Sequence, residues 1–432
     1  MPLEGRLTPG ALKGLPSVAS PGRTRFAATF LALSVLAICV ATLRSAGDTI
    51  PSGWTFSLAQ GDEALAEIIQ NLLLFIPFGA ALALVLGSPS PEGRGGQGVR
   101  IERRGGQGVR LLAAGLALSF TVEFLQQWIP GRDPSLGDIA TNGTSTLLGA
   151  AIVWTAPRWL HPPEHVAPWL SLGAAAVAAA AWLGTGWLLR PMLPLADALE
   201  LRTPDLGGHT DLYTGRVLAV TGRIGVTEPL TIVVTAGTPA MSRRFAPILD
   251  VDDGPGPAGT IVAADRTDLV LRNRSRSMFL HLARPDLRAR DALAGVAPGD
   301  TVTITAWRHP RHRTFCLARD GKPSCGLGYT IGDGWKLIFF PDHFPTWGLY
   351  VLNALWVGGG LLGVGLWGRR DRATGIALLV AALALALGPP LVGLTVTPIT
   401  EWLGGVGGLV LGLAWRRRSR LSSLSRPAPI PR

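Results

Sequence analysis

"LLAAGLALSFTVEFLQQWIPGRDPSLGDIATNGTSTLLGAAIVW", residues 111–154, decides the class of this fold. Two apolar runs flank a polar junction, residues 123–142, whose charged and amide side chains are Glu123, Gln126, Gln127, Arg132, Asp133, Asp138 and Asn142. Placing such side chains in hydrocarbon costs free energy, so they mark either a functional site or the water-exposed end of a membrane helix. The stretch therefore predicts two membrane helices joined by a polar loop.

The rest of the chain extends this pattern. The 432 residues are 47% hydrophobic and 16% charged, and apolar runs of about 18–22 residues are long enough to cross a bilayer as helices. The predicted spans are 26–43, 67–87, 111–129, 139–155, 168–189, 346–366, 374–394 and 399–415. We therefore expect an α-helical polytopic membrane protein of about eight spans. The net charge of +11 predicts no nucleic-acid partner, because the basic residues are clustered in short loops and tails.

Basic residues orient the spans, since short cytoplasmic loops carry an excess of Arg and Lys. Basic residues precede the first span, lie between the second and third spans, and follow the fourth, sixth and last spans. Because successive spans cross the membrane in opposite directions, all five positions lie on the same side of the membrane. This predicts a multi-pass protein with both termini in the cytoplasm and residues 190–345 extracytoplasmic. A cleaved signal peptide is the alternative for the first run, but its apolar core is longer than is typical, so we interpret it as a span.

The insert between the fifth and sixth spans has the pattern of β structure. Short segments rich in Val, Ile, Thr and Phe are separated by Gly, Pro and Asp, for example "LTIVVTA" (230–236) and "DTVTITAW" (300–307). The pattern predicts an all-β antiparallel sandwich. It resembles laminin-G-like or concanavalin-A-like jelly-roll domains, which implies a face that binds a glycan or a periplasmic protein, sometimes with calcium. "DVDDGPG" (250–256) lacks the Glu of an EF-hand calcium loop, so we expect an Asp-Gly turn there, and no metal or cofactor.

A hairpin in the insert pairs two of the three cysteines. In "RTFCLARDGKPSC" (313–325), Asp320 and Gly321 form the expected two-residue turn, and the resulting register places Cys316 opposite Cys325. On a non-hydrogen-bonded rung the Cα atoms are about 4.5 Å apart, which lets a disulfide close. A disulfide needs an oxidising compartment, in agreement with the predicted extracytoplasmic placement.

Helical spacing gathers the polar residues of the second, third and fourth spans into three pairs at i, i+3 or i, i+4, each on one helix face. The pairs are Glu67 and Asn71, Glu123 and Gln126, and Asp138 and Asn142. In the predicted topology all of them lie near the extracytoplasmic end of their spans, beneath a loop that contains Arg132. The sequence therefore predicts a polar cluster in the outer part of the membrane.

The same region carries apolar and helix-disrupting residues in a fixed order: Phe75, Pro77, Gly79, Pro130, Gly131 and Gly149. Pro77 removes a backbone hydrogen bond within the second span, and Gly79 permits a close helix approach. Together with the polar pairs, this set resembles the VanZ-like family of bacterial membrane proteins over about residues 65–155. One departure is Ser145, at a position where the family has glycine. The resemblance implies the bacterial cytoplasmic membrane and a family named for a protein linked to teicoplanin resistance.

Three functional hypotheses follow. We favour a non-enzymatic site that binds or excludes an amphiphile at the outer leaflet, a membrane lipid or lipid-linked envelope component, with Arg132 facing an anionic headgroup. The second is an enzyme acting on a lipid-linked substrate with Glu123 or Asp138 as general base, although no nucleophile or metal-protease motif accompanies them. The third is an adhesion or sensor protein whose sandwich recognises the ligand. The structural alternative is an interhelical hydrogen-bond clamp that serves packing alone.

One further carboxylate, Glu401, stands at the start of the last span in "TPITEWLGG" (397–405). Thr397 can cap this helix and Pro398 fits its first turn, so the helix dipole accounts for Glu401 without a function.

The sequence predicts six regions and a flexible linker at 94–110. The regions are a disordered basic cytoplasmic tail (1–25), a VanZ-like transmembrane domain (26–160), a fifth span (168–189), the β-sandwich (200–342), three C-terminal spans (346–415) and a basic cytoplasmic tail (416–432).

Overall fold

The fold is described from a computed structural model. The described residues are 21–45, 53, 63–87, 97–192, 200–202, 212–222, 229–237, 245–252, 259–309, 314–339 and 344–424. The chain divides into two compact units, one of residues 1–58 with 71–156 and the other of residues 59–70 with 157–432. Of the predicted tails, residues 1–20 and 425–432 lie outside the described part. Residues 21–25 belong to α1, which corrects their predicted disorder, and residues 416–424 belong to α8.

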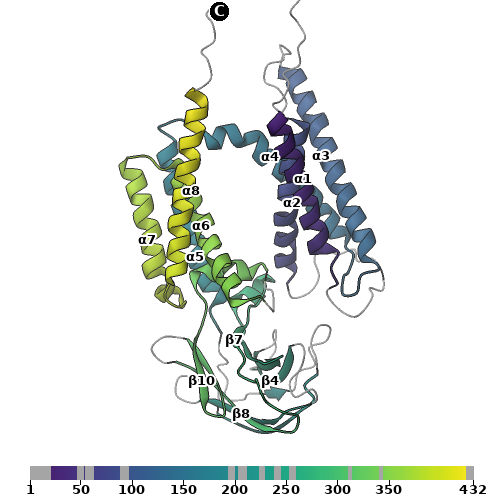
Figure 1. The fold of residues 1–432 in the computed structure, drawn as a ribbon, viewed down its shortest axis with the longest axis vertical. Helices are drawn as coiled ribbons and strands as arrows, with labels where there is room; N and C mark the ends of the chain where they lie inside the picture. The colour runs from purple at the N-terminus through teal and green to yellow at the C-terminus, as the bar shows by residue number, and fades with distance from the viewer. Residues whose placement is uncertain are drawn as a thin grey trace, which may run out of the picture. The chain divides into compact units, whose positions relative to one another are not determined.

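Four helices build the first unit (Figure 1): α1 Pro21–Thr42, α2 Ala64–Leu86, α3 Gln97–Gln126 and α4 Leu136–Leu160. Their shared core contains Ile38 of α1, Phe75 and Phe78 of α2 and Val122 of α3. The helix α3 begins at Gln97, so most of the expected linker is helical, which corrects the prediction for residues 97–110.

Glycines set the distance between α2 and α4. A Cβ atom added at Gly79 would lie 2.0 Å from the carbonyl oxygen of Thr146, and one at Gly149 would lie 2.1 Å from that of Ile76. Only glycine fits where two backbones approach this closely. Pro77 lies between these contacts, inside α2, where its ring interrupts the hydrogen-bond ladder of the helix.

The described strands of the second unit form two five-stranded antiparallel sheets, with orders β1-β4-β5-β6-β7 and β10-β9-β8-β3-β2. Their bounds are β1 Glu200–Arg202, β2 Arg216–Thr221, β3 Leu230–Thr235, β4 Ala246–Asp252, β5 Thr260–Asp265, β6 Asp268–Arg272, β7 Leu287–Ala289, β8 Thr301–Arg308, β9 Phe315–Arg319 and β10 Lys322–Leu327. Two 3-10 helices accompany them, η1 Arg276–Leu280 and η2 Ile331–Leu337. An inserted all-β domain is therefore present, whereas its jelly-roll topology stays a prediction.

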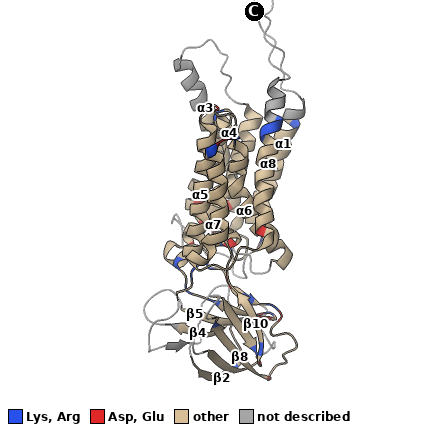
Figure 2. Ribbon diagram, turned by 90° about the vertical axis from the view of Figure 1, so that its left-hand side faces the viewer, with Lys and Arg blue, Asp and Glu red and all other residues tan. Residues whose placement is uncertain are grey.

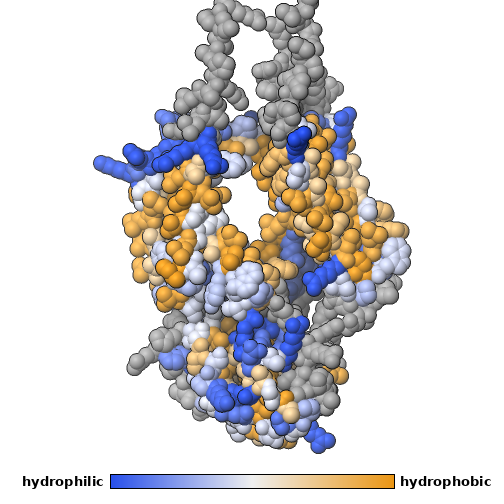
Figure 3. Space-filling model, viewed as in Figure 1, coloured by the Kyte–Doolittle hydropathy of each residue, from blue (hydrophilic) through white to orange (hydrophobic). Residues whose placement is uncertain are grey.

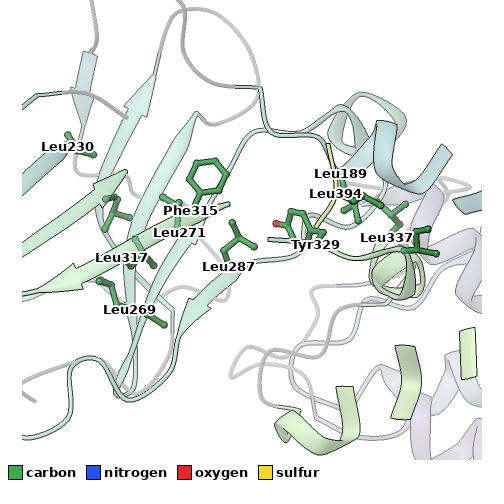
Figure 4. Close-up of a cluster of buried hydrophobic side chains, with 14 of the residues drawn as sticks. Leu189, Leu230, Leu269, Leu271, Leu287, Phe315, Leu317, Tyr329, Leu337 and Leu394 are labelled. Carbon is green, nitrogen blue, oxygen red and sulfur yellow. The ribbon is translucent and has the colours of Figure 1, made fainter. Parts of the chain in front are cut away.

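Both sheets contribute to one hydrophobic cluster, as expected for a sandwich. Alternate residues of β3 and β8, such as Ile232 and Ile304, meet Leu269 and Leu271 of β6 in its interior. Figure 4 shows that the cluster continues through Tyr329 to Leu337 and Leu394, at the ends of the helices of the same unit. The β domain and these helices therefore share buried apolar surface.

The hairpin of β9 and β10 has the predicted register. Lys322 pairs with Arg319, and the turn residues Asp320 and Gly321 both have positive φ, 48° and 76°. Cys316 and Cys325 form a disulfide with their Cα atoms 4.1 Å apart. The register shifts after Ser324, which the sequence alone did not predict. The predicted disulfide is confirmed.

Four helices complete the second unit: α5 Ala167–Leu189, α6 Thr346–Trp367, α7 Arg372–Val392 and α8 Ile399–Leu424. Glycines join α6 to α8, because a Cβ atom at Gly408 would lie 1.9 Å from the carbonyl oxygen of Gly358. Trp182 of α5 is fully buried in the shared core. The helices α6 and α8 therefore form the tightest pair of this unit.

Six described helices are long and apolar enough to cross a membrane: α1, α2, α3, α5, α6 and α7. Large apolar side chains remain exposed on their surfaces, among them Val177 (70%) and Leu391 (76%). Figure 3 shows such side chains over the visible faces of the helices. Exposed apolar surface on this scale is what a bilayer covers. The chain is a multi-pass membrane protein, and spans at α4 and α8 stay predictions.

Candidate functional site

Glu123 is the most buried carboxylate of the polar cluster, with 3% of its surface exposed. It lies near the end of α3, and its Oε2 accepts a hydrogen bond of 2.9 Å from the backbone N–H of Ser135, just before α4. A buried charge is costly unless such bonds compensate it. Glu123 therefore fixes the loop that enters α4.

Asn71 of α2 and Asp138 of α4 are in direct contact. The Asn71 Nδ2 donates to Asp138 Oδ1 at 2.8 Å, so the second span meets the fourth as the spacing predicted. Glu67, expected beside Asn71, is exposed in the first turns of α2 and groups with the second unit. Of the predicted pair Glu67 and Asn71, it is Asn71 that forms this contact between α2 and α4.

Asn142, one turn further along α4, is 3% exposed. Its Nδ2 donates to the hydroxyl of Ser119 at 2.9 Å, while its Oδ1 is buried and accepts no hydrogen bond from a described residue. Ser145 donates back to the carbonyl of Thr141 and is fully buried, so a serine fits at this position. One acceptor of the cluster is therefore available to a donor that the described chain does not supply.

The end of α1 is held by two residues of the junction. Gln126 Nε2 donates to the carbonyl of Thr42 at 3.0 Å, and Arg132 donates from Nε to Arg44 (3.0 Å) and from Nη2 to Ala41 (2.8 Å). The last carbonyls of a helix lack partners within it, and basic side chains near that end are favourable. Arg132 therefore caps α1, a role that the sequence did not indicate.

The loop that carries Arg132 turns at Pro130 and Gly131. Gly131 has a φ of 75°, a conformation that glycine adopts without strain, and Ser45 donates its hydroxyl to the Pro130 carbonyl at 3.2 Å. Burial lowers the pKa of the Arg132 guanidinium from its ordinary value, and the nearby Glu123 carboxylate opposes this shift. A bound anion beside Arg132 would raise the pKa of its guanidinium, as the Glu123 carboxylate does.

These contacts join all four helices of the first unit through polar side chains. Among the described residues there is no group of three or more His, Cys, Asp or Glu that could hold a metal ion. Asp250 is described, whereas Asp253 of the acidic segment lies outside the described residues. The cluster offers hydrogen-bond donors, acceptors and one cation.

Comparison with known proteins identifies this helical region. Residues 25–157 match the VanZ/LLP1 family. The matched region begins at α1, in agreement with the predicted VanZ-like domain of residues 26–160, and extends beyond the residues 65–155 that carry the resemblance. The end of α1 contacts Gln126 and Arg132 of the same region. No curated protein and no solved structure matches the chain.

Glu401 has more partners than the helix dipole alone would require. It is fully buried in the first turn of α8, and its Oε2 accepts a hydrogen bond of 3.0 Å from the backbone N–H of Gly332. Thr397, expected to cap α8, donates its hydroxyl to the carbonyl of Leu385 at 2.6 Å. The sequence could not indicate these partners, because they come from distant segments.

Proposed function

We propose that this VanZ-like membrane protein binds or excludes an amphiphile, a membrane lipid or lipid-linked envelope component, at the outer leaflet of a bacterial cytoplasmic membrane. The observation that carries the proposal is the buried Asn142 Oδ1 without a described partner, in a cluster that also contains Arg132. Buried polar atoms are rarely left unpaired, so an orphaned acceptor supports a hydrogen bond from a ligand donor or water at this position. The Arg132 guanidinium supplies the complementary cation for a headgroup.

The proposed orientation has eight spans, cytoplasmic termini and an extracytoplasmic β domain. In the second unit, Arg416, Arg417 and Arg418 lie near the far end of α8, whereas its first turn contacts η2 after the last strand (Figure 2). Arg369 and Arg370 follow α6 at its far end as well. Basic residues on the side away from the β domain favour a cytoplasmic position there.

The disulfide provides a test of this orientation. In protein taken from cells and denatured under an alkylating agent, we expect Cys39 to be labelled at once and Cys316 and Cys325 only after reduction. The reason is that disulfides persist in oxidising compartments and are rare in the cytosol. Mass spectrometry of the alkylated peptides measures the result. Free thiols at Cys316 and Cys325 would contradict an extracytoplasmic β domain.

Substitution of Arg132 tests the headgroup proposal. In a susceptible bacterium that expresses the chain, we expect Arg132→Gln to reduce any protection against teicoplanin, because glutamine retains a donor for the α1 carbonyls but loses the charge. The half-buried neighbour Gln127 supplies the control, and Gln127→Ala should preserve the effect. Equal protection by the wild type and Arg132→Gln, at equal protein levels, would count against an anionic headgroup.

Replacing Glu123 separates binding from catalysis. Glu123→Gln keeps an acceptor for the Ser135 N–H, so the loop before α4 should persist, but an amide cannot act as a general base. Full function of Glu123→Gln in the same assay supports the non-enzymatic proposal. Its loss, with the fold intact, favours the enzyme acting on a lipid-linked substrate.

We also propose that the β domain contributes a face for a glycan or a periplasmic protein, as laminin-G-like or concanavalin-A-like domains do. Two antiparallel sheets over a common core support a sandwich of this kind. Deletion of residues 205–340 tests whether this domain alone accounts for the function. A phenotype that persists after the deletion would remove the adhesion or sensor alternative.

A further inference from the structure

A second polar pocket lies entirely within the second unit, where the segment after β10 meets the first turns of α6 and α8. It has a volume of about 290 Å³. Its exposed lining residues include Arg290, Thr346 and Tyr350, and its buried ones include Tyr329, Asn353 and Glu401. The pocket therefore has an open rim with one cation above a buried polar floor.

Hydrogen bonds within the protein occupy the floor. Glu401 accepts from the hydroxyl of Thr330 and the backbone N–H of Gly332, and Asn353 donates to Asp333 Oδ1 at 3.0 Å. Tyr329 donates to the carbonyl of Pro285 at 2.5 Å, and burial raises its pKa above the usual range, so it remains a neutral donor. Because these groups satisfy one another, the floor is rigid and a ligand meets chiefly the rim.

Ion pairs neutralise most charges around the pocket. Asp286 pairs with Arg272 at 2.5 Å and Arg288 at 3.2 Å, and Asp333 pairs with Lys336 at 2.6 Å. Among the described residues, Arg290 forms no ion pair, and its Nη2 donates to the carbonyl of Phe344 at 2.9 Å. A guanidinium has five N–H donors, so Arg290 retains donors for an anion.

The start of α6 adds further donors at the same rim. Pro345 is its N-cap and provides no side-chain cap, and Thr346 is the first helical residue. The N–H groups of Gly348 and Leu349 donate to the Pro345 carbonyl, which leaves those of Thr346 and Trp347 at the start of the helix. Such N–H groups attract anions together with the helix dipole. Arg290 and this uncapped helix start therefore converge on one cavity.

The position along α6 indicates the source of the anion. The helix α6 is a candidate membrane span from Thr346 onwards, and Trp347 (71%) and Tyr350 (53%) are exposed in its first turns. Exposed Trp and Tyr at the end of a span are typical of the membrane interface, where lipid headgroups lie. The rim is thus placed at the level of lipid phosphates.

We propose that this pocket binds the phosphate of an anionic membrane-lipid headgroup, held by Arg290 and the backbone N–H groups of Thr346 and Trp347. It is a second site, distinct from the cluster around Glu123, and it does not depend on the function proposed for that cluster. It requires only that α6 begins at the membrane surface.

The test uses the full chain in neutral detergent, titrated by calorimetry with short-chain phosphatidylglycerol, short-chain phosphatidylcholine and glycerol phosphate. We expect phosphatidylglycerol to bind about tenfold more tightly than phosphatidylcholine, and Arg290→Ala to abolish this preference. Arg290 is exposed, so its loss should leave the fold intact; Arg216→Ala, an exposed arginine of β2, is the matched control. Glycerol phosphate binding as tightly as the lipid identifies a soluble phosphate ester, and weak binding identifies the lipid.

A second variant tests the helix start by itself. Pro345 has φ −64° and ψ 145°, a conformation compatible with a following proline, and proline is tolerated at the first helical position. Thr346→Pro removes one backbone N–H, whereas Thr346→Ala removes only the hydroxyl, so we expect the proline variant to bind phosphatidylglycerol more weakly. The proposal is overturned if the wild type shows no preference for phosphatidylglycerol, or if Arg290→Ala binds it as the wild type does.

Discussion

Gly149→Ala is expected to destabilise the VanZ-like region. The added methyl group would lie 2.1 Å from the carbonyl oxygen of Ile76 and 2.8 Å from the backbone nitrogen of Ala80. Both are backbone atoms of α2, so no side-chain rotation relieves the clash and the helices must separate. Overpacking in a core costs about 1–3 kcal/mol, and a backbone contact belongs at the upper end of that range.

Cys39 provides the measurement, because it is the one free cysteine among the described residues and lies in α1. The temperature at which its thiol reacts with a maleimide should fall by several degrees in Gly149→Ala. Gly106→Ala is the control, since a Cβ atom at Gly106 of α3 meets nothing within 4 Å. Alanine is also the better helix former, so this change should be neutral or slightly stabilising. Identical behaviour of both variants would show that α2 and α4 are not in close contact.

Asp286→Ala should destabilise the β domain by about 3–5 kcal/mol, the cost of removing one partner from a buried ion pair. The Asp286 side chain is fully buried between Arg272 and Arg288, whose own side chains are 18% and 8% exposed. Its loss removes the carboxylate that Arg272 and Arg288 share, and both guanidinium groups are largely buried. Arg288 retains Asp265 at 2.6 Å, so Arg272 bears most of the effect.

Limited trypsin digestion of the full chain at increasing temperature measures this change through cleavage at the arginines of β6 and β7. Asp320→Asn is the matched control, because Asp320 is exposed, lies 3.6 Å from Arg319 and has a positive φ that asparagine tolerates. Exposed ion pairs contribute about 0–1 kcal/mol, so its digestion pattern should stay close to that of the wild type. Equal stability of the two variants would contradict a buried charge network.

The helices were predictable because each is an uninterrupted apolar run, and the hairpin because an Asp-Gly turn fixes its register. Helical spacing placed Asp138 and Asn142 on one face of α4, whereas the partners of Glu123 and Asn142, Ser135 and Ser119, were not predicted. The side chains that suggested the VanZ-like family lie only within residues 65–155, although the matched region begins at residue 25, because α1 contributes backbone carbonyls to the cluster.

Long-range partners explain the other differences. Glu401 was interpreted from its own helix, yet its hydrogen-bond partners come from residues 330–332 and from Asn353, about fifty to seventy residues earlier. The pocket beside it is formed by segments that are distant in the sequence, so local periodicity contains no signal for it. Residues 97–110 are helical in α3 although their glycines, which are poor helix formers, favoured a linker.

The irregular pairing of β2 and β10 has a consequence for how other chains can approach this protein. These strands are the two edges of one sheet; β10 carries Lys322, Pro323 and a register shift, and β2 has a register shift between Val217 and Ala219. Charges, proline and bulges at sheet edges prevent a foreign strand from extending the sheet. Self-association and fibril-like stacking through the edges of this sheet are therefore disfavoured, and a partner that binds this sheet must dock on its face or its loops.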